Sequence, residues 1–479
     1  MNNENTKFLS DSLSTPIPRP AEIIVPNDVQ TFAEAYARLP AGGKITIRPG
    51  TYEVPQTVKI RKRITIIGTP AAPESVILKG GKNAILRILS GNAEIRGITF
   101  QNQGNNYLSA AVEFNVPTGR LESCVFTSQA GYGLHVGQKD SNPVVISCIA
   151  RNCGRSGFLI SNGAGGTFTE CEAEGNILSG IQVSDYGTAP TLKKCGCSRN
   201  KENGITFLEG AGGLFIECEA NENEKSGILL QDSNTEPTLK KCGCSRNKEN
   251  GITFLEGAGG TFIECEARGN ARSGIHLQNS GTNPTLEKCG ASENLGTGIY
   301  VCDRADGTFT DCEISQNKGY GIQVEDCETN PIIKKCAFVD GKFGGIFVSL
   351  GSYGTFTECN VRGNEGDGME VADRGTNPTV EKCGFNDGQS SGIYVHSGAA
   401  GTFIECEARN NKGWGLLIAD SGTNPTVTKC QIQNNLKSGI WVQESASGIF
   451  RNNHLTGNAR AWSIDETCRV VREGNEPNQ

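Results

Sequence analysis

The stretch PTLKKCGCSRNKENGITFLEGAGG fills Pro190–Gly213 and returns, unchanged at all 24 positions, at Pro237–Gly260. The two copies start 47 residues apart, which indicates a tandem duplication. A repeat of fixed period is the sequence signature of a solenoid, in which each unit buries its apolar face only by stacking on its neighbours. This unit therefore decides the fold class, and most of the chain can be aligned to it.

Cysteines mark the same period along the chain. Fourteen of the 20 cysteines are spaced alternately by 24 and 23 residues, so one coil is about half of the 47-residue unit. These are Cys124, Cys148, Cys171, Cys195, Cys218, Cys242, Cys265, Cys289, Cys312, Cys336, Cys359, Cys383, Cys406 and Cys430. Each is followed by a glycine nine residues later and by apolar residues ten and twelve residues later. An apolar, variable, apolar order is the period of a β-strand.

Asparagine recurs five positions after the cysteine in ten coils. The series is Asn176, Asn200, Asn223, Asn247, Asn270, Asn294, Asn317, Asn364, Asn411 and Asn435. Asparagine tolerates left-handed backbone dihedrals, and its amide can bond a stacked neighbour, so we expect an asparagine ladder at a sharp bend. The repeat as a whole predicts an all-β, right-handed parallel β-helix solenoid of about 18 coils, roughly 85 Å long at the spacing of stacked strands.

The pattern predicts one long domain with two distinct ends. The expected divisions are a flexible N-terminal tail over 1–21, a single β-helix domain over 22–465, and a C-terminal cap and tail over 466–479. Within the domain we expect an N-terminal cap and irregular coils over 22–120, regular coils of 23 or 24 residues over 121–445, and the last coil over 446–465.

Both ends of the solenoid are expected to be covered, because an open end exposes unpaired backbone groups. Asp28 is a candidate cap for a short helix over Val29–Leu39 that would plug the first coil. Strands are expected next at Lys44–Arg48, Thr57–Arg61 and Ile64–Gly68. At the far end, four apolar residues are expected to cover the last coil: Trp462, Ile464, Val470 and Val471.

Composition argues against several classes of function. The net charge of −7 lacks the positive surface that dominates nucleic-acid binding, so no nucleic-acid ligand is expected. No run of about 18 apolar residues occurs, so no membrane partner is expected. The segment MNNENTKFLSDSLSTPIPRP lacks the apolar core of a secretion signal, which together with the abundant cysteines predicts a cytoplasmic location.

Six cysteines lie outside the regular series: Cys153, Cys197, Cys244, Cys302, Cys327 and Cys468. Cysteines stacked at strand spacing would be close enough for disulfides, but parallel side chains need not reach the disulfide torsion. Free cysteine also packs as a small hydrophobe. We therefore predict reduced packing cysteines, with disulfides or a metal site as alternatives.

A charged residue precedes most cysteines of the series, and its sign alternates from coil to coil. The row reads Glu170, Lys194, Glu217, Lys241, Glu264, Lys288, Asp311, Lys335, Glu358, Lys382, Glu405 and Lys429. Like charges stacked at strand spacing would repel each other, so the alternation favours a solvated, stabilising stripe.

The position between the two apolar residues of each strand is predicted to face outward. Tyr300, Phe347, Tyr394 and Trp441 occupy it in every second coil, about 9.6 Å apart, and Gln323 lies between the first two. We predict that these five residues bind a ligand. Aromatic rings on a rigid sheet suit stacking on sugar rings and equally suit a protein interface. The simplest alternative is that they only follow the preference of aromatics for strands.

Three positions further on, most coils carry an acid. The row is Asp185, Glu209, Asp232, Glu256, Asp303, Asp326, Asp373, Asp420 and Glu444. Calcium could bind such carboxylates, but a solvated face is the simpler interpretation, so we predict neither a metal ligand nor a cofactor. If the chain is an enzyme, Glu370 with Asp326 or Asp303 is the best carboxylate pair for acid–base chemistry, and His276 and His396 lie near it in register.

Two parts of the sequence resemble known families. The segment Gly43–Gly68, GKITIRPGTYEVPQTVKIRKRITIIG, is similar to the opening of pectinesterase-type and pectate-lyase-like β-helices. The repeat resembles that of carbohydrate-binding proteins, sugar hydrolases and certain F-box proteins. Together these likenesses cover about residues 22–460. They imply a right-handed parallel β-helix, in a family of lyases, esterases, hydrolases, epimerases and non-catalytic modules.

The catalytic patterns of these enzymes are missing from the sequence. It lacks the NTD, paired-aspartate, GHG and RIK segments of polygalacturonase-like hydrolases in that form, and any stretch matching the acid and arginine patterns of pectate lyases or pectinesterases. The favoured function is therefore a non-catalytic recognition module that binds a polysaccharide or a protein partner along the aromatic face. The alternatives are a polysaccharide lyase, hydrolase or esterase with a divergent carboxylate site, and a structural scaffold.

Overall fold

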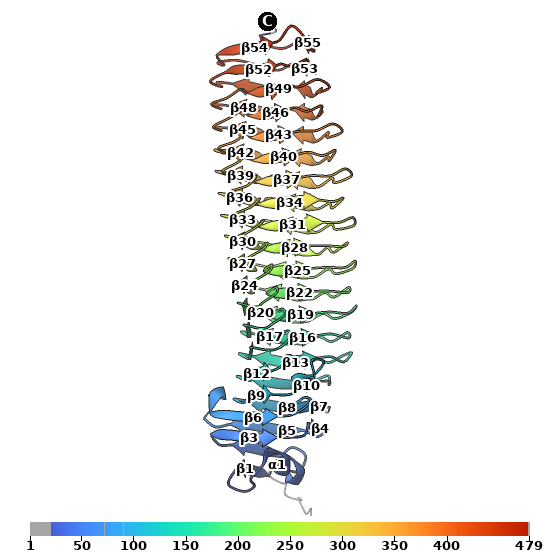
Figure 1. Ribbon diagram of the computed structural model, residues 1–479, viewed down its shortest axis with the longest axis vertical. Coiled ribbons are helices and arrows are strands. Elements are labelled where there is room, and N and C mark those ends of the chain that lie inside the picture. The colour runs from blue at the N-terminus through green and yellow to red at the C-terminus, as the bar shows by residue number, and fades with distance from the viewer. Residues whose placement is uncertain (1–20, 71, 90, 478–479) are drawn as a thin grey trace, which may run out of the picture.

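The computed structural model describes residues 21–70, 72–89 and 91–477, and the chain forms one tall column of stacked turns (Figure 1). About 19 turns are present, one more than expected. Each strand pairs in parallel with the equivalent strand of the turn before and the turn after. The right-handed parallel β-helix predicted from the repeat is thereby confirmed. Most of the expected flexible tail, residues 1–20, lies outside the described residues.

Three parallel sheets run along the column. Sheet A extends from β1 (Glu22–Val25) to β55 (Arg469–Glu473), and sheet B from β3 (Gly50–Val54) to β51 (Gln431–Gln433). Sheet C carries the candidate site. Its strands are β4 (Val58–Ile60), β7 (Leu86–Ile88), β10 (Ala110–Phe114), β13 (Tyr132–Val136), β16 (Phe158–Ile160), β19 (Ile181–Val183), β22 (Ile205–Phe207), β25 (Ile228–Leu230), β28 (Ile252–Phe254), β31 (Ile275–Gln278), β34 (Ile299–Cys302), β37 (Ile322–Val324), β40 (Ile346–Val348), β43 (Met369–Val371), β46 (Ile393–Val395), β49 (Leu416–Ile418), β52 (Ser438–Val442) and β54 (Arg460–Ile464).

A single turn shows how the repeat forms these strands. In this turn, β29 (Thr261–Ile263) lies in sheet A, β30 (Glu266–Arg268) in sheet B and β31 in sheet C. The middle residues of β29 and β30 are buried, and so are the first and third residues of β31. Parallel register places like residues on one another, so Ile275 stacks between Ile252 and Ile299. The apolar face of each turn is therefore buried by its neighbours.

The regular cysteines lie at the corner between sheets A and B. The residue before each cysteine turns the chain with a positive φ, which is 54° at Glu264 and 52° at Lys288. Cys265 then points inward, and its thiol donates to the carbonyl of Ile263 at 3.6 Å. The residues with alternating charge thus adopt left-handed backbone conformations at this corner, and their side chains are exposed to solvent. Pairs such as Lys241 and Glu264, 3.6 Å apart, each contribute under about 1 kcal/mol.

The corner between sheets B and C holds the asparagine ladder. Asn247 is buried, its Nδ2 donates to Oδ1 of Asn270 at 3.0 Å, and its own Oδ1 accepts from Nδ2 and the backbone N–H of Asn223, both at 3.0 Å. The amide ladder is confirmed, but the expectation of left-handed dihedrals at asparagine is wrong. The residue before it takes that conformation, as Arg246 does with a φ of 53°, because the buried amide must stay directed along the axis.

The N-terminal end is closed by a helix, α1 (Phe32–Arg38), at the foot of the column in Figure 1. The expected capping helix is therefore present, but Asp28 does not cap it. Oγ1 of Thr31 accepts from the N–H of Glu34 at 3.2 Å, whereas Asp28 accepts from the N–H of Ile24 at 2.8 Å. The helix begins later than expected because threonine supplies the local cap.

The three strands expected near the N-terminus are present as β2 (Lys44–Ile47), β4 and β5 (Ile64–Gly68). At the far end, β54 and β55 form the last turn. From this turn Trp462, Ile464 and Val470 pack against the core, whereas Val471 is 44% exposed. The solenoid therefore continues past residue 465, where the domain was expected to end.

One continuous hydrophobic core fills the column. All 20 cysteines are free, and 18 of them are buried, which agrees with reduced cysteines used for packing. Cys327 is exposed and Cys468 is intermediate. Within the described part of the chain, no helix is long and apolar enough to cross a membrane.

Candidate binding face

The outer face of sheet C holds the predicted ligand-binding residues in one column. The residues in register on β34 to β52 are Tyr300, Gln323, Phe347, Glu370, Tyr394, Leu417 and Trp441. Four aromatic rings therefore recur in every second turn, about 9.6 Å apart along the axis. We call this set of seven residues the aromatic column.

The rings are half-buried rather than fully exposed, because each packs against a second ring: three of the pairs are stacked, and the two tryptophans are tilted at 36°. The pairs and their centroid distances are His276–Tyr300 (5.2 Å), Tyr320–Phe347 (4.8 Å), Tyr394–His396 (4.2 Å) and Trp414–Trp441 (4.8 Å). Tyr320 and Trp414 lie two residues before a strand of sheet C, at the position eight residues after the cysteine. Sequence reasoning missed both, although most other coils have a small or polar residue there. This packing holds the orientations of the rings on the outer face of sheet C.

Glu370 lies at the centre of a hydrogen-bonded group on this surface. Its Oε2 accepts from the hydroxyl of Tyr320 at 2.7 Å, and its Oε1 lies 3.2 Å from Nε2 of His396. Burial raises the pKa of Glu370, but the hydrogen bonds from His396 and Tyr320 outweigh burial and hold this pKa below its ordinary value. Burial and this carboxylate together raise the pKa of Tyr320, so its hydroxyl remains a donor. Glu370 is thus an ionised carboxylate held in a fixed position.

Glu325 is a second fixed carboxylate, and sequence reasoning missed it. It directly follows β37, and its Oε2 accepts from the hydroxyl of Tyr300 at 2.8 Å. Its Oε1 accepts from Nε2 of Gln323 at 2.7 Å. The two predicted ligand-binding residues Tyr300 and Gln323 therefore share one carboxylate. The sequence did hold a signal for Glu325. It is an acid two residues after a position of the aromatic column, and the residue type at that place varies among the other coils.

Asp303 and Asp326 do not hydrogen-bond to the Glu370 group. They lie in the turns that follow β34 and β37, and Oδ2 of Asp326 accepts from the N–H of Asp303 at 3.1 Å. The same bond recurs along the acidic row, as from the N–H of Ser397 to Oδ2 of Asp420 at 2.9 Å. The acidic row thus forms hydrogen bonds between successive turns of the solenoid. Among the described residues, no group of three or more His, Cys, Asp or Glu side chains could hold a metal ion.

His276 belongs to a different cluster. Its Nε2 lies 3.7 Å from Sγ of Cys302, and its Nδ1 lies 3.4 Å from the Nδ2 of Asn250. That amide is fixed, because its Oδ1 accepts from the N–H of Ser273 at 3.0 Å. Burial, with a smaller effect of Arg272, lowers the pKa of His276 to about 4, and burial raises the pKa of Cys302 to about 11. Both groups are neutral at pH 7, so the thiol is not an activated nucleophile.

A shallow groove continues the same face toward the N-terminus. It has a volume of about 540 Å³ and is lined by side chains that include Gln182, Thr206, Thr253, His276 and Gln278. Because His276 also stacks on Tyr300, the groove leads directly into the aromatic column. Four leucines also line it (Leu178, Leu208, Leu229 and Leu255), so the groove can both hydrogen-bond and pack against a long ligand that lies along the axis.

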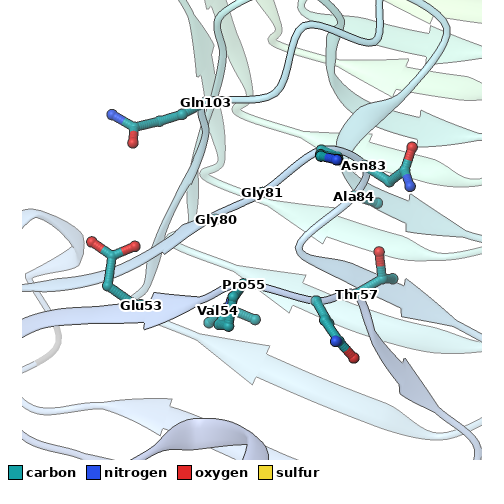
Figure 2. Close-up of a pocket in the computed structure, with 11 residues that line it drawn as sticks. Glu53, Val54, Pro55, Thr57, Gly80, Gly81, Asn83, Ala84 and Gln103 are labelled. Atoms are coloured by element: carbon teal, nitrogen blue, oxygen red, sulfur yellow. The ribbon is translucent and has the colours of Figure 1, made fainter.

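A separate hollow of about 510 Å³ lies between the first turns. Figure 2 shows Glu53 and Gln103 on one side of it and Thr57 and Asn83 on the other. Its lining includes one acid, Glu53, one base, Lys82, and no histidine or cysteine. It therefore gathers no catalytic set of side chains, and the aromatic column does not contribute to it.

Comparison with protein families gives one match. The family described as right-handed β-helix region matches residues 83–242, 207–354 and 333–476. No curated protein matches the chain.

Several solved structures are similar to the chain. Pectate lyase Pel9A is 18% identical, with 58% of this chain and 70% of that chain covered and a TM-score of 0.31. The A-module of the mannuronan C-5 epimerase AlgE6 from Azotobacter vinelandii is 14% identical, with coverage of 91% and 92% and a TM-score of 0.28. The Vag8–C1 inhibitor complex matches at 12% identity, with coverage of 90% and 98% and a TM-score of 0.47. At such identities the likeness does not extend to activity.

Proposed function

Because the chain belongs to the right-handed β-helix family, whose members share a fold more than an activity, we propose that it is a recognition module that binds a polysaccharide along the outer face of sheet C. The observation that carries this proposal is the order of the aromatic column. Rings at Tyr300, Phe347 and Tyr394 alternate with the hydrogen-bonding side chains of Gln323 and Glu370. Sugar rings offer apolar faces for stacking and hydroxyl groups for hydrogen bonds, so the alternation suits a sugar chain.

The fixed geometry of the column supports binding. The Tyr300 hydroxyl and the Gln323 amide are both held by Glu325, and the Phe347 ring is held by Tyr320. Side chains that are already ordered lose little conformational entropy when a ligand arrives. The shallow groove continues the surface by several turns, so a long sugar chain can gain affinity along the whole face.

The chemistry around the column favours recognition over catalysis. The neutral His276–Cys302 pair is not activated, and Asp303 and Asp326 are used by turns rather than placed against Glu370. The group of Glu370, His396 and Tyr320 is the remaining candidate for acid–base work. An assay for released sugar therefore belongs in the first experiment.

The proposal is tested by co-sedimentation and affinity electrophoresis with neutral, amino-bearing and acidic polysaccharides. The wild type is compared with the double variant Phe347→Ala/Tyr394→Ala, and Tyr186→Ala serves as the control because Tyr186 is 83% exposed outside the column. We expect binding to at least one polysaccharide, at least tenfold weaker in the double variant and unchanged in the control, without product. Binding that survives the double variant would contradict the proposal, and released product would make the chain an enzyme.

A further inference from the structure

We infer that the polysaccharide bound by the aromatic column carries free amino groups rather than carboxylates, an inference that rests on the proposed function. The face and an amino-bearing polysaccharide are complementary in charge. The part of the face from Tyr300 to Trp441 presents fixed carboxylates beside aromatic rings, and lysine and arginine do not pair with those carboxylates.

The excess of acid is local to this face. The carboxylates in question are Asp303, Glu325, Asp326, Asp367, Glu370, Asp373, Asp420 and Glu444. Over the described residues, the ion pairs formed by this set are those of His396 with Glu370 at 3.2 Å and Asp420 at 3.9 Å. On other faces, acids have cationic partners, as in Arg199–Glu174 and Lys248–Glu224, both at 2.6 Å. Lysine and arginine therefore form no ion pair with this set over the described residues, although Lys437 lies on the same face with its Nζ 3.7 Å from the centre of the Trp414 ring.

Glu370 remains charged when a ligand approaches, whereas burial raises the pKa of the nearby Asp367 carboxyl. Hydrogen bonds from Tyr320 and His396 stabilise the charged form of Glu370, and those from Tyr300 and Gln323 hold Glu325. On the rim, the nearby carboxyl of Asp420 raises the pKa of Glu444, as expected where acids crowd together. Summed over several turns, such charges attract cations and repel polyanions.

The rings and carboxylates together match an ammonium group. Glu370 lies in register between Phe347 on one side and Tyr394 on the other. An ammonium group gains from the face of an aromatic ring and from a charged hydrogen bond to a carboxylate. A carboxylated sugar placed there would face both the repulsion of Glu370 and the desolvation of its own charge.

The spacing of Glu325 and Glu370 along the axis also suits a sugar polymer. Glu325 follows β37, and Glu370 lies in β43, two turns further on, so they are offset along the axis by about 9.6 Å. A disaccharide step is close to this length, so amino groups on alternate sugars could meet both carboxylates. The groove beyond His276 is lined by three bases and two acids, of which Lys225 and Glu202 pair at 2.8 Å, and it can hold the rest of the chain.

The test compares three oligosaccharides of equal length: β-1,4-linked glucosamine, its fully N-acetylated form, and oligogalacturonate. Affinities are measured by calorimetry at pH 6 and low salt. We expect the glucosamine oligomer to bind at least tenfold more tightly than the acetylated form, and oligogalacturonate to bind most weakly. This comparison uses the wild-type chain, so it stands even if a variant fails to fold.

Two double variants test whether the preference for amino sugars comes from the outer face of sheet C. Glu325→Gln/Glu370→Gln should lose at least tenfold in affinity for glucosamine and little for the acetylated form. Glu217→Gln/Glu264→Gln, which changes the net charge equally at the corner between sheets A and B, should lose little. The inference would be overturned if both double variants lost the same affinity. It would also be overturned if the acetylated form or oligogalacturonate bound as tightly as the glucosamine oligomer, or more tightly. Either result would leave the proposed function standing. If the chain binds none of the three oligosaccharides nor any polysaccharide of the first panel, the proposed function itself is wrong.

Discussion

The hydroxyl of Tyr320 donates to Oε2 of Glu370 at 2.7 Å across two turns of the solenoid. The turn between them supplies Gly344 at the position where a side chain would block this contact. A Cβ at Gly344 would lie 3.0 Å from the Tyr320 ring and 2.7 Å from the carbonyl oxygen of Asp367. A missing side chain in one turn therefore lets aromatic and acidic residues of two others form one surface.

Gly344→Ala should loosen this part of the face. The added methyl group collides with backbone as well as with the ring, and overpacking of this kind costs about 1–3 kcal/mol. Amide hydrogen exchange in β37, β40 and β43 should become correspondingly faster. The control is Gly290→Ala, because a Cβ there meets its nearest atom at 3.6 Å. Equal effects of the two variants would show that the close approach at Gly344 is unimportant.

Asn247→Ala should weaken the solenoid locally. The change removes the partner of the buried N–H of Asn223 and of the carbonyl of Ala220. The Nδ2 of Asn223 and the Oδ1 of Asn270 each keep one partner, the carbonyl of Cys197 and the backbone N–H of residue 247. Each buried group left unsatisfied costs about 1–3 kcal/mol, so we expect a loss of at least about 2 kcal/mol. Hydrogen exchange of the amides in the flanking turns measures it. Lys248→Ala, one residue away on the surface, is the control and should change stability by less than about 0.5 kcal/mol.

His276 should make the stability of its turn depend on pH. Its pKa falls from an ordinary 6.5 to about 4, so between these values the unfolded state binds more protons than the folded state. Stability is then complete above pH 6.5 and falls as the pH drops toward 4, by about 3 kcal/mol in all. The local opening free energy of β31 from hydrogen exchange should show this slope, and His276→Phe, which keeps a stacking ring, should flatten it. A slope that persists in the variant would assign the effect to other groups.

The cysteines should divide sharply by reactivity. Cys327 is exposed and Cys468 is intermediate, whereas the other 18 are buried. An aromatic disulfide reagent should therefore modify one thiol quickly, a second slowly, and all 20 only after unfolding. Cys327→Ser should remove the fast phase. Fewer than 20 thiols in the unfolded, unreduced protein would reveal disulfides and contradict the packing role.

The repeat alone was sufficient to predict the solenoid and the register of the aromatic column. Cysteines spaced by 24 and 23 residues fix the length of each turn, so Tyr300, Phe347 and Tyr394 had to stack in every second turn. The asparagine ladder followed in the same way. In each case the prediction succeeded because parallel stacking converts an offset in sequence into a place in space.

The details of the face could not be predicted, because they depend on side chains that reach between turns. Tyr320 contacts Glu370 only because Gly344 leaves room, and Glu325 is set by the hydroxyl of a residue 25 positions earlier. Register placed His276 near the carboxylates, yet the amide of Asn250 holds it beside a thiol instead.

The most direct test of the account is hydroxyl-radical footprinting of the chain with its tightest-binding polysaccharide. We predict that oxidation of Tyr394 and Trp441 falls in the complex, while Tyr186, which is 83% exposed, is oxidised as before. Protection confined to sheet A or sheet B, with the aromatic column as reactive as in the free protein, would contradict the claim that this face binds the ligand.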